Sequence, residues 1–175
     1  MTNDGLVRRL LLIALVLSIV QAAWHLVQLP ALSAAWFDAA GEPRVFVPTQ
    51  WLAWGHAGLA CAVAAAAWLV PEFGGPRQTA GPSQRPGVAG LAESATAYAE
   101  RRARERHVWR VTWLGLVTLL VLGAIAQLVY DANRTPIPRL DVEAVLWIGA
   151  GYGAFLLLWA LRGSREFGTT GAGPR

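Results

Sequence analysis

The chain has 175 residues, of which 55% are hydrophobic and 15% charged, and its formal net charge is +4. A soluble domain usually carries about 25% charged residues, so this composition argues against an ordinary soluble domain. A single cysteine, Cys61, excludes an intrachain disulfide and any CxxC metal or redox motif. The basic residues are all Arg and lie at the ends of apolar runs instead of on one shared face, which argues against nucleic-acid binding.

Four charge-free apolar runs follow one another along the chain, at residues 10–29, 51–70, 111–130 and 144–161. At a rise of about 1.5 Å per residue, a helix of this length spans roughly 27–30 Å, the thickness of the hydrocarbon core of a bilayer. Inside lipid the backbone must satisfy its own hydrogen bonds, so the runs should be helical. The sequence therefore predicts an all-α integral membrane protein, a four-helix bundle.

The first run has a second interpretation. Its basic start, at Arg8 and Arg9, and the segment Val20-Gln21-Ala22 are also typical of a cleaved secretory signal. The apolar character continues to Leu29, which favours a membrane helix of full length. Whether this run is cleaved stays open, and the intact mass of the purified protein would decide it.

The distribution of Arg predicts the orientation. Twelve Arg lie before the first run, between the second and third runs, or after the fourth, whereas the other two loops hold only Arg44, Arg134 and Arg139. By the positive-inside rule both termini and the middle segment lie in the cytoplasm. The exclusive use of Arg with many Ala and Gly indicates the codon bias of a GC-rich bacterial genome. We therefore expect a multi-pass protein of the bacterial inner (cytoplasmic) membrane.

The same pattern divides the chain into segments. Residues 1–70 form the first transmembrane hairpin, whose outer loop is 30–50. Residues 71–90, rich in Gly, Pro, Ser and Gln, are expected to be a flexible cytoplasmic linker that begins where Pro71 stops the second run. Residues 91–161 form the second hairpin, with a cytoplasmic helical extension and the outer loop 131–143. Residues 162–175 are expected to be a disordered cytoplasmic tail.

The two outer loops are the most distinctive part of the sequence. In the first loop Gly41, which can adopt a positive φ, and Pro43 predict a turn. Phe37-Asp38-Ala39 and Tyr130-Asp131-Ala132 occupy similar places in the two loops, so one hypothesis is that the fold consists of two duplicated helix–loop–helix hairpins.

One of these loops resembles a known family. Leu29-Pro30, followed after five residues by Trp36-Phe37-Asp38-Ala39-Ala40-Gly41-Glu42-Pro43, resembles the signature of the bacterial family called domain of unknown function 1648. That family includes the N-terminal part of SdpI-like toxin-immunity and signalling membrane proteins. The resemblance covers about residues 21–70, and Trp36, Asp38 and Arg44 stand where the signature usually has His, Asn and Asp. It implies a membrane interaction protein that uses its first outer loop.

Three groups of residues are candidates for function. The partner-binding candidates lie in the outer loops and are Trp36, Phe37, Asp38, Gly41, Glu42, Pro43, Arg44, Asp131, Arg134 and Arg139. His25 and His56 lie at similar depth in adjacent runs and are candidate ligands for haem or a metal, or simply interfacial histidines. The small residues Gly58, Ala62, Gly149 and Gly153 are candidates for close helix packing, within one chain or in a dimer.

The preferred functional hypothesis is a binding protein of the immunity or signalling type, with no enzymatic activity. Its partners would be the lipid bilayer and a protein, peptide or lipid on the outer face, with the chain a monomer or homodimer and no nucleic acid or cofactor involved. A small transporter or channel subunit is one alternative. A haem- or metal-binding membrane protein, through His25 and His56, is another. No catalytic constellation is present in the sequence.

Overall fold

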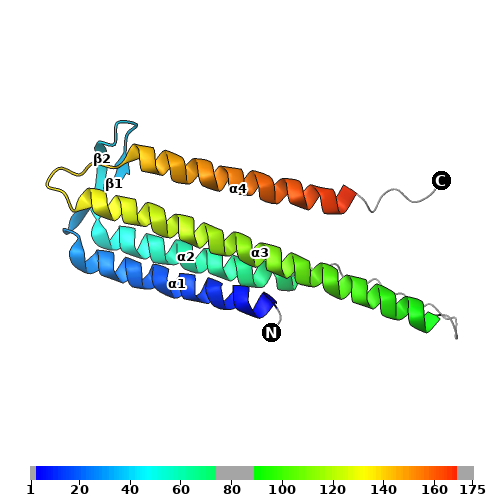
Figure 1. Ribbon diagram of the computed structural model, residues 1–175. Helices are drawn as coiled ribbons and strands as arrows, with labels where there is room; N and C mark the ends of the chain where they lie inside the picture. The colour runs from blue at the N-terminus through cyan, green and yellow to red at the C-terminus, as the bar shows by residue number, and fades with distance from the viewer. Residues whose placement is uncertain (1–2, 74–88, 169–175) are drawn as a thin grey trace. The chain divides into compact units, whose positions relative to one another are not determined.

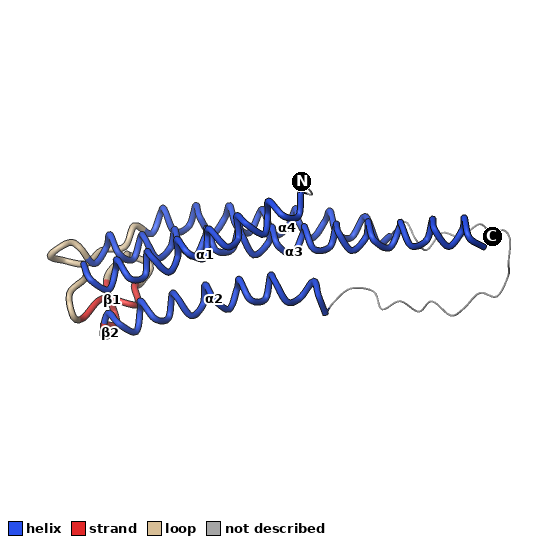
Figure 2. The backbone as a smooth tube through the Cα atoms, turned by 90° about the horizontal axis from the view of Figure 1, so that it is seen from below, coloured by secondary structure: helices blue, strands red, loops and turns tan. Residues whose placement is uncertain are grey.

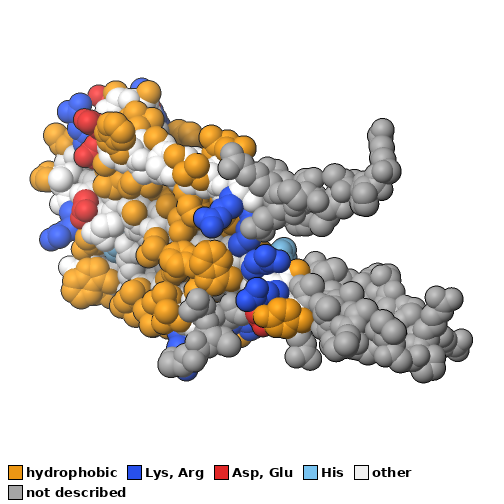
Figure 3. Space-filling view, turned by 45° about the vertical axis from the view of Figure 1, so that its right-hand side comes forward, with side chains coloured by type: hydrophobic (Ala, Val, Ile, Leu, Met, Phe, Trp, Pro, Cys, Tyr) orange, Lys and Arg blue, Asp and Glu red, His pale blue; other side chains and the backbone are white. Residues whose placement is uncertain are grey.

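The computed structural model describes residues 3–73 and 89–168. In chain order the elements are α1 (Asn3–Gln28), β1 (Leu32–Phe37), β2 (Pro43–Pro48), α2 (Thr49–Phe73), α3 (Ala89–Asn133) and α4 (Val142–Gly168) (Figure 1). All four helices are long and apolar enough to cross a membrane. On the face shown in Figure 3, hydrophobic side chains cover much of the surface of the described helices. The prediction of four apolar helices of spanning length is confirmed.

Two of the expected helix ends were placed too early. Helix α2 continues through Pro71 to Phe73, because a proline in the last turn removes one N–H and leaves the preceding turns intact. Helix α4 continues to Gly168, so residues 162–168 of the expected disordered tail are helical. Residues 169–175 of that tail and residues 74–88 of the expected linker lie outside the described residues. Helix α3 is a single helix of 45 residues.

The all-α prediction missed one element, an antiparallel hairpin of β1 and β2. The predicted turn at Gly41 is confirmed, because Gly41 has a φ of 78° and Pro43 begins β2. The run Val45-Phe46-Val47 in β2 consists of β-branched and aromatic residues, which favour strands. Figure 2 shows the two strands, in red, between the end of α1 and the start of α2.

The chain divides into two compact units, and the helices α1, α2 and α3 each contribute to both. The first unit comprises Met1–Trp24 and Ala53–Leu122. Its core is apolar and built from small and aliphatic side chains of three helices, namely Leu11, Ala14, Ala60, Ala64, Ala67, Leu116 and Leu119. Two of these helices approach closely at Gly115, where an added Cβ would lie 2.4 Å from the Cβ of Ala67. Alanine and glycine thus let these backbones pack tightly.

The small residues singled out from the sequence take no part in this packing. A Cβ added at Gly58, Gly149 or Gly153 would meet no atom within 4 Å, and Ala62 is exposed. Within their own units these positions are thus open, and their role in packing helices together within one chain stays a prediction. Sequence spacing identified small residues on a helix face but gave no information on which face meets a neighbouring helix. Packing against a second copy stays a prediction.

The second unit comprises His25–Leu52 and Gly123–Arg175. It contains the hairpin, the ends of α1 and α3, the start of α2, and α4. Many of its buried residues are polar, and they are His25, Ser33, Thr49 and Asn133, alongside the buried Ala34, Tyr130 and Ala132. This unit is held together to a large extent by hydrogen bonds, and all of the loop candidates lie in it.

A candidate binding cap

We call the hairpin with its flanks, residues 29–49, together with residues 133–142, the cap; all of it belongs to the second unit. The hairpin turn is organised by Asp38. Its Oδ1 accepts the backbone N–H groups of Ala40 and Glu42, each at 2.9 Å. Its Oδ2 accepts the Nε–H of Arg44 at 2.9 Å and lies 2.7 Å from the Arg44 Nη2. The carboxylate of Asp38 is thus used to close the turn.

These contacts favour the ionised form of Asp38. The hydrogen bond from the backbone of Glu42 lowers the pKa of the Asp38 carboxyl below its ordinary value, and the bond from Ala40 and the guanidinium of Arg44 act in the same direction. Arg44 itself is 63% exposed. Of the loop residues predicted to bind a partner, Asp38 and Arg44 therefore have a structural role within the turn.

The outer side of β1 is closed by one side chain of α3. The Asn133 Oδ1 accepts the N–H of Ala34 at 2.6 Å, and the Asn133 Nδ2 donates to the C=O of Ala34 at 3.0 Å. The same Nδ2 donates to the C=O of Val129 at 2.8 Å, which fixes the amide to its own helix. The side-chain amide thus reproduces the pair of hydrogen bonds that a neighbouring strand would make. Because Ala34 and Asn133 are both buried, these bonds satisfy groups that water does not reach.

The base of the hairpin is tied by hydroxyl groups. The Oγ atoms of Ser33 and Thr49 lie 2.7 Å apart, and the Thr49 hydroxyl also donates to the C=O of Pro30. The N–H of Thr49 donates to the C=O of Ala31 at 3.0 Å. Thr49 is the first residue of α2, so these bonds join the start of that helix to the hairpin.

The turn of the hairpin is joined to the segment that leads into α4. The N–H of Leu140 donates to the C=O of Gly41 at 2.9 Å, and Gly41 is buried. An added Cβ on Gly41 would lie 2.3 Å from the Leu140 carbonyl oxygen, so both its φ and this close approach require glycine. Beside this contact is an open pocket of about 420 Å³, lined by Ala39, Ala40, Arg139, Leu140, Asp141 and Val142.

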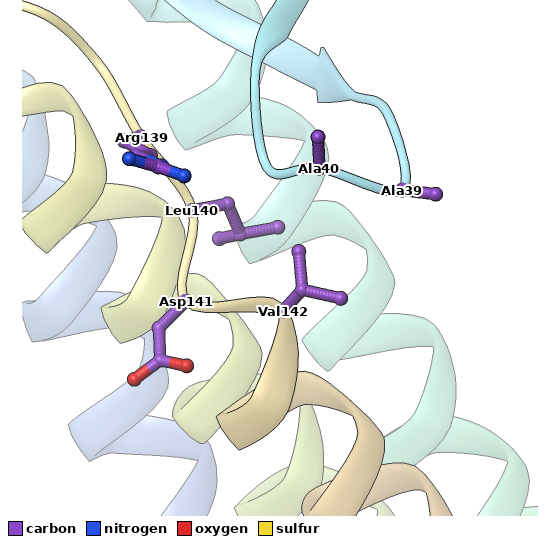
Figure 4. Close-up of a pocket in the computed structure, with 6 residues that line it drawn as sticks. All are labelled: Ala39, Ala40, Arg139, Leu140, Asp141 and Val142. Atoms are coloured by element: carbon purple, nitrogen blue, oxygen red, sulfur yellow. The ribbon is translucent and has the colours of Figure 1, made fainter.

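The residues of this pocket point in different directions. Figure 4 shows the side chains of Leu140 and Val142 pointing toward the hairpin turn, and that of Asp141 pointing away from it. The Asp141 Oδ1 accepts the N–H of Ala144 at 3.0 Å, so Asp141 caps the N-terminus of α4. Arg139 lines the pocket, and it is the one predicted binding residue found there. The pocket thus lies where the hairpin turn meets the segment that leads into α4.

Beneath the cap, His25 belongs to a polar cluster. It is 7% exposed, and its ring stacks on Tyr130 with a centroid separation of 4.3 Å. Its Nε2 lies 3.4 Å from the Oε1 of Gln127, whose Nε2 donates to Asp131 at 3.1 Å. The guanidinium of Arg134 lies 5.5 Å from the centre of the Tyr130 ring. Asp131 and Arg134, both predicted to bind a partner, therefore contact residues of their own helix end.

His56 belongs to the first unit, whereas His25 belongs to the second. His56 forms a hydrogen bond with the backbone of Ser18, and its Nε2 is buried. Among residues 3–73 and 89–168, no group of three or more His, Cys, Asp or Glu is placed to hold a metal ion. Each histidine thus has its own surroundings within its unit.

The cap exposes several large apolar side chains beside its charged ones. Five of its large apolar side chains are about half exposed or more: Leu32 at 59%, Trp36 at 67%, Val45 at 49%, Phe46 at 51% and Ile137 at 80%. Glu42 is exposed, while Phe37 and Pro43 are half-buried. Trp36 was among the sequence candidates, but Leu32, Val45 and Phe46 were missed because the strand register that exposes them was not foreseen. Asn133 was missed because an asparagine at the end of a helix has no sequence pattern that identifies its partner.

Comparisons with protein-family models, with curated proteins and with solved structures found no match for this chain. A turn closed by Asp38, a strand edge closed by Asn133 and a joint at Gly41 together hold a small group of exposed apolar side chains in fixed positions.

Proposed function

We propose that this chain is a multi-pass membrane protein whose cap faces the outside of the bacterial inner membrane and binds a partner protein or peptide. The observation that carries the proposal is the exposure of Leu32, Trp36, Val45 and Phe46 on a hairpin fixed by hydrogen bonds. Aromatic side chains that are held rigidly give large contact areas at a low entropic cost, and they are enriched at binding sites. Function would thus reside in the cap, and the helices would anchor it.

Two features of the sequence support this proposal. The imbalance of Arg between alternate segments supports an orientation with both termini in the cytoplasm. The resemblance of residues 29–43 to the signature of the domain of unknown function 1648 family supports an immunity- or signalling-like role. In this arrangement Trp36 is the central contact residue, while Asp38, Gly41 and Arg44 keep the turn in the binding conformation.

The orientation is tested by labelling single cysteines. In a Cys61→Ala background, Glu42→Cys places one thiol on the hairpin turn, and Arg104→Cys places one on the N-terminal part of α3. We expect a membrane-impermeant maleimide to label position 42 in intact cells and position 104 only after the membrane is opened. The reverse pattern would overturn the proposed orientation.

Partner binding is tested by photocrosslinking in living cells. A photoreactive phenylalanine analogue replaces Trp36 in one variant and Tyr98, which is 59% exposed on α3, in the matched control. We expect an adduct with a different protein at position 36 that is absent at position 98, and loss of that adduct when Asp38→Ala disorders the turn. No adduct at position 36, or an adduct with a second copy of this chain alone, would contradict the binding of a foreign partner.

A further inference from the structure

The outer edges of β1 and β2 differ in their hydrogen bonding. The N–H of Thr49 donates to the C=O of Ala31, so these residues form a hydrogen-bonded pair. In an antiparallel ladder such pairs alternate with pairs whose backbone groups point outward. The register places Ser33 opposite Val47 and Ala34 opposite Phe46. Ala34 and Phe46 therefore direct their N–H and C=O groups away from each other, toward the outer edges of β1 and β2.

Of these two positions, only Ala34 has hydrogen-bond partners for its outward N–H and C=O groups. The outward groups of Ala34 are both bonded to the side chain of Asn133. Among the described residues, the backbone of Phe46 makes no hydrogen bond outside the hairpin. At Phe46 the edge of β2 thus presents one N–H and one C=O, flanked by the exposed Val45 and the half-buried Val47. An unpaired edge of this kind is a template for another strand.

We propose that the edge of β2 pairs with the edge of β2 in a second copy of this chain, related by a two-fold axis at Phe46. In this arrangement the N–H of each Phe46 donates to the C=O of the other, and each Val45 lies opposite the Val47 of the second copy. Two copies that insert into a membrane in the same direction carry the cap at the same depth, so their β2 edges can meet. This dimer requires that both copies have the same orientation in the membrane, and it does not depend on which side of the membrane the cap faces.

The chemistry of the edge favours self-pairing. The three residues that would meet are Val, Phe and Val, and aromatic and β-branched pairs across strands are favourable. No like charges are brought opposite one another among them, and the nearest charge, on Arg44, is already paired with Asp38 in its own chain. An isolated two-stranded hairpin is marginal in water, and pairing two of them gives a sheet of four strands.

The ends of the strand limit the assembly to two copies. Pro43 and Pro48 stand at the two ends of β2 and have no N–H, so the pairing cannot extend beyond a short segment. Asn133 occupies the corresponding groups of β1, so a third hairpin cannot add there by the same bonds. A closed two-fold dimer, and not an open fibre, is the expected product.

The register of the pair allows a specific test by disulfide trapping. The native Cys61 is first replaced by Ala, so that each variant carries a single thiol. In the proposed dimer the Cα atoms of the two residues at position 46 are about 5.5 Å apart, within the range of a disulfide. Two residues at position 45 are diagonal neighbours about 7–8 Å apart, beyond that range. A thiol at position 32, on β1, has no counterpart in the pair.

In oxidised native membranes we expect Phe46→Cys to form cross-linked dimers several-fold more than Val45→Cys, Val47→Cys or Leu32→Cys alone. Membranes that contain Val45→Cys and Val47→Cys chains together should cross-link as strongly as Phe46→Cys, which keeps the test valid if position 46 does not tolerate cysteine. When both of these cysteine variants also carry Phe46→Pro, the cross-link should be abolished, because proline lacks the N–H that bonds to the other copy. Equal cross-linking at positions 32, 45 and 46, or none in the mixed sample, would overturn the proposal without bearing on a foreign partner at Trp36.

Discussion

The two units of this protein are held together by different forces. In the first unit the buried hydroxyls serve their own helices, since Ser18 donates to the C=O of Ala14 and Thr112 to that of Val108. In the second unit buried polar side chains join separate elements, as Asn133 joins α3 to β1 and Thr49 joins α2 to Ser33. Close packing of small residues brings the apolar helices of the first unit together. A cap made of loops needs hydrogen bonds with defined partners.

The largest loss of local stability, and so the strongest test of this difference between the two units, is expected when Asn133 is replaced. Asn133→Ala leaves the buried N–H and C=O of Ala34 without partners, which should cost about 2–4 kcal/mol in local stability. This corresponds to roughly 30- to 1,000-fold faster amide hydrogen exchange in the hairpin. Exchange measured by mass spectrometry on peptides from residues 30–48 would show it.

The matched control for this change is Thr135→Ala. The Thr135 hydroxyl is exposed and bonds to the C=O of Ala132 in its own segment, so exchange in the hairpin should stay as in the parent protein. If Asn133→Ala left the hairpin exchange unchanged, the cap would not depend on this amide, and the contrast between the units would lose its main support.

A smaller effect is expected in the apolar unit. Gly115→Ala places a Cβ 2.4 Å from that of Ala67, and the backbone of α2 or α3 must shift to relieve the clash. Overpacking of this kind costs about 1–3 kcal/mol. Thermal unfolding in detergent, followed by circular dichroism, should therefore give a lower midpoint.

Gly153→Ala is the control with the opposite expected sign. A Cβ at Gly153 meets nothing within 4 Å, and alanine is the better helix former by up to about 1 kcal/mol. The midpoint should be unchanged or higher. Equal destabilisation by both substitutions would show that Gly115 is not a special point of close approach.

The smallest effect is expected from the titration of Asp38. Because the folded state lowers the pKa of this carboxyl, its contribution to stability is present above the ordinary pKa of an aspartic acid and is lost as the pH falls through the lower, folded value. Protease cleavage of the turn should therefore increase below about pH 4. Asp38→Asn should show the higher cleavage already at pH 7 and no further acid dependence. A parent protein cleaved equally at pH 3 and pH 7 would contradict the assignment.

The sequence was informative where structure depends on local composition. Four apolar runs of spanning length predicted four helices, because in lipid a helix is what satisfies the backbone of such a run. Gly41 predicted a turn, because few other residues adopt a positive φ without strain. The sequence was less informative at Pro71, because the apolar run ends just before this residue but the helix continues for three residues beyond the run, to Phe73.

Only the tertiary structure decided which side chains make contacts within the protein and which are open to their surroundings. The structure shows Asp38 and Arg44, both expected to bind a partner, paired with each other in their own turn, and it places open space beside Gly149 and Gly153. Asn133 is 99 residues from Ala34 along the chain, and no local pattern specifies such a pair. Composition and periodicity are properties of one segment, and they determined the helices. Hydrogen bonds between segments depend on the register of the strands and on which segments lie close together, and both are defined only once the chain is folded.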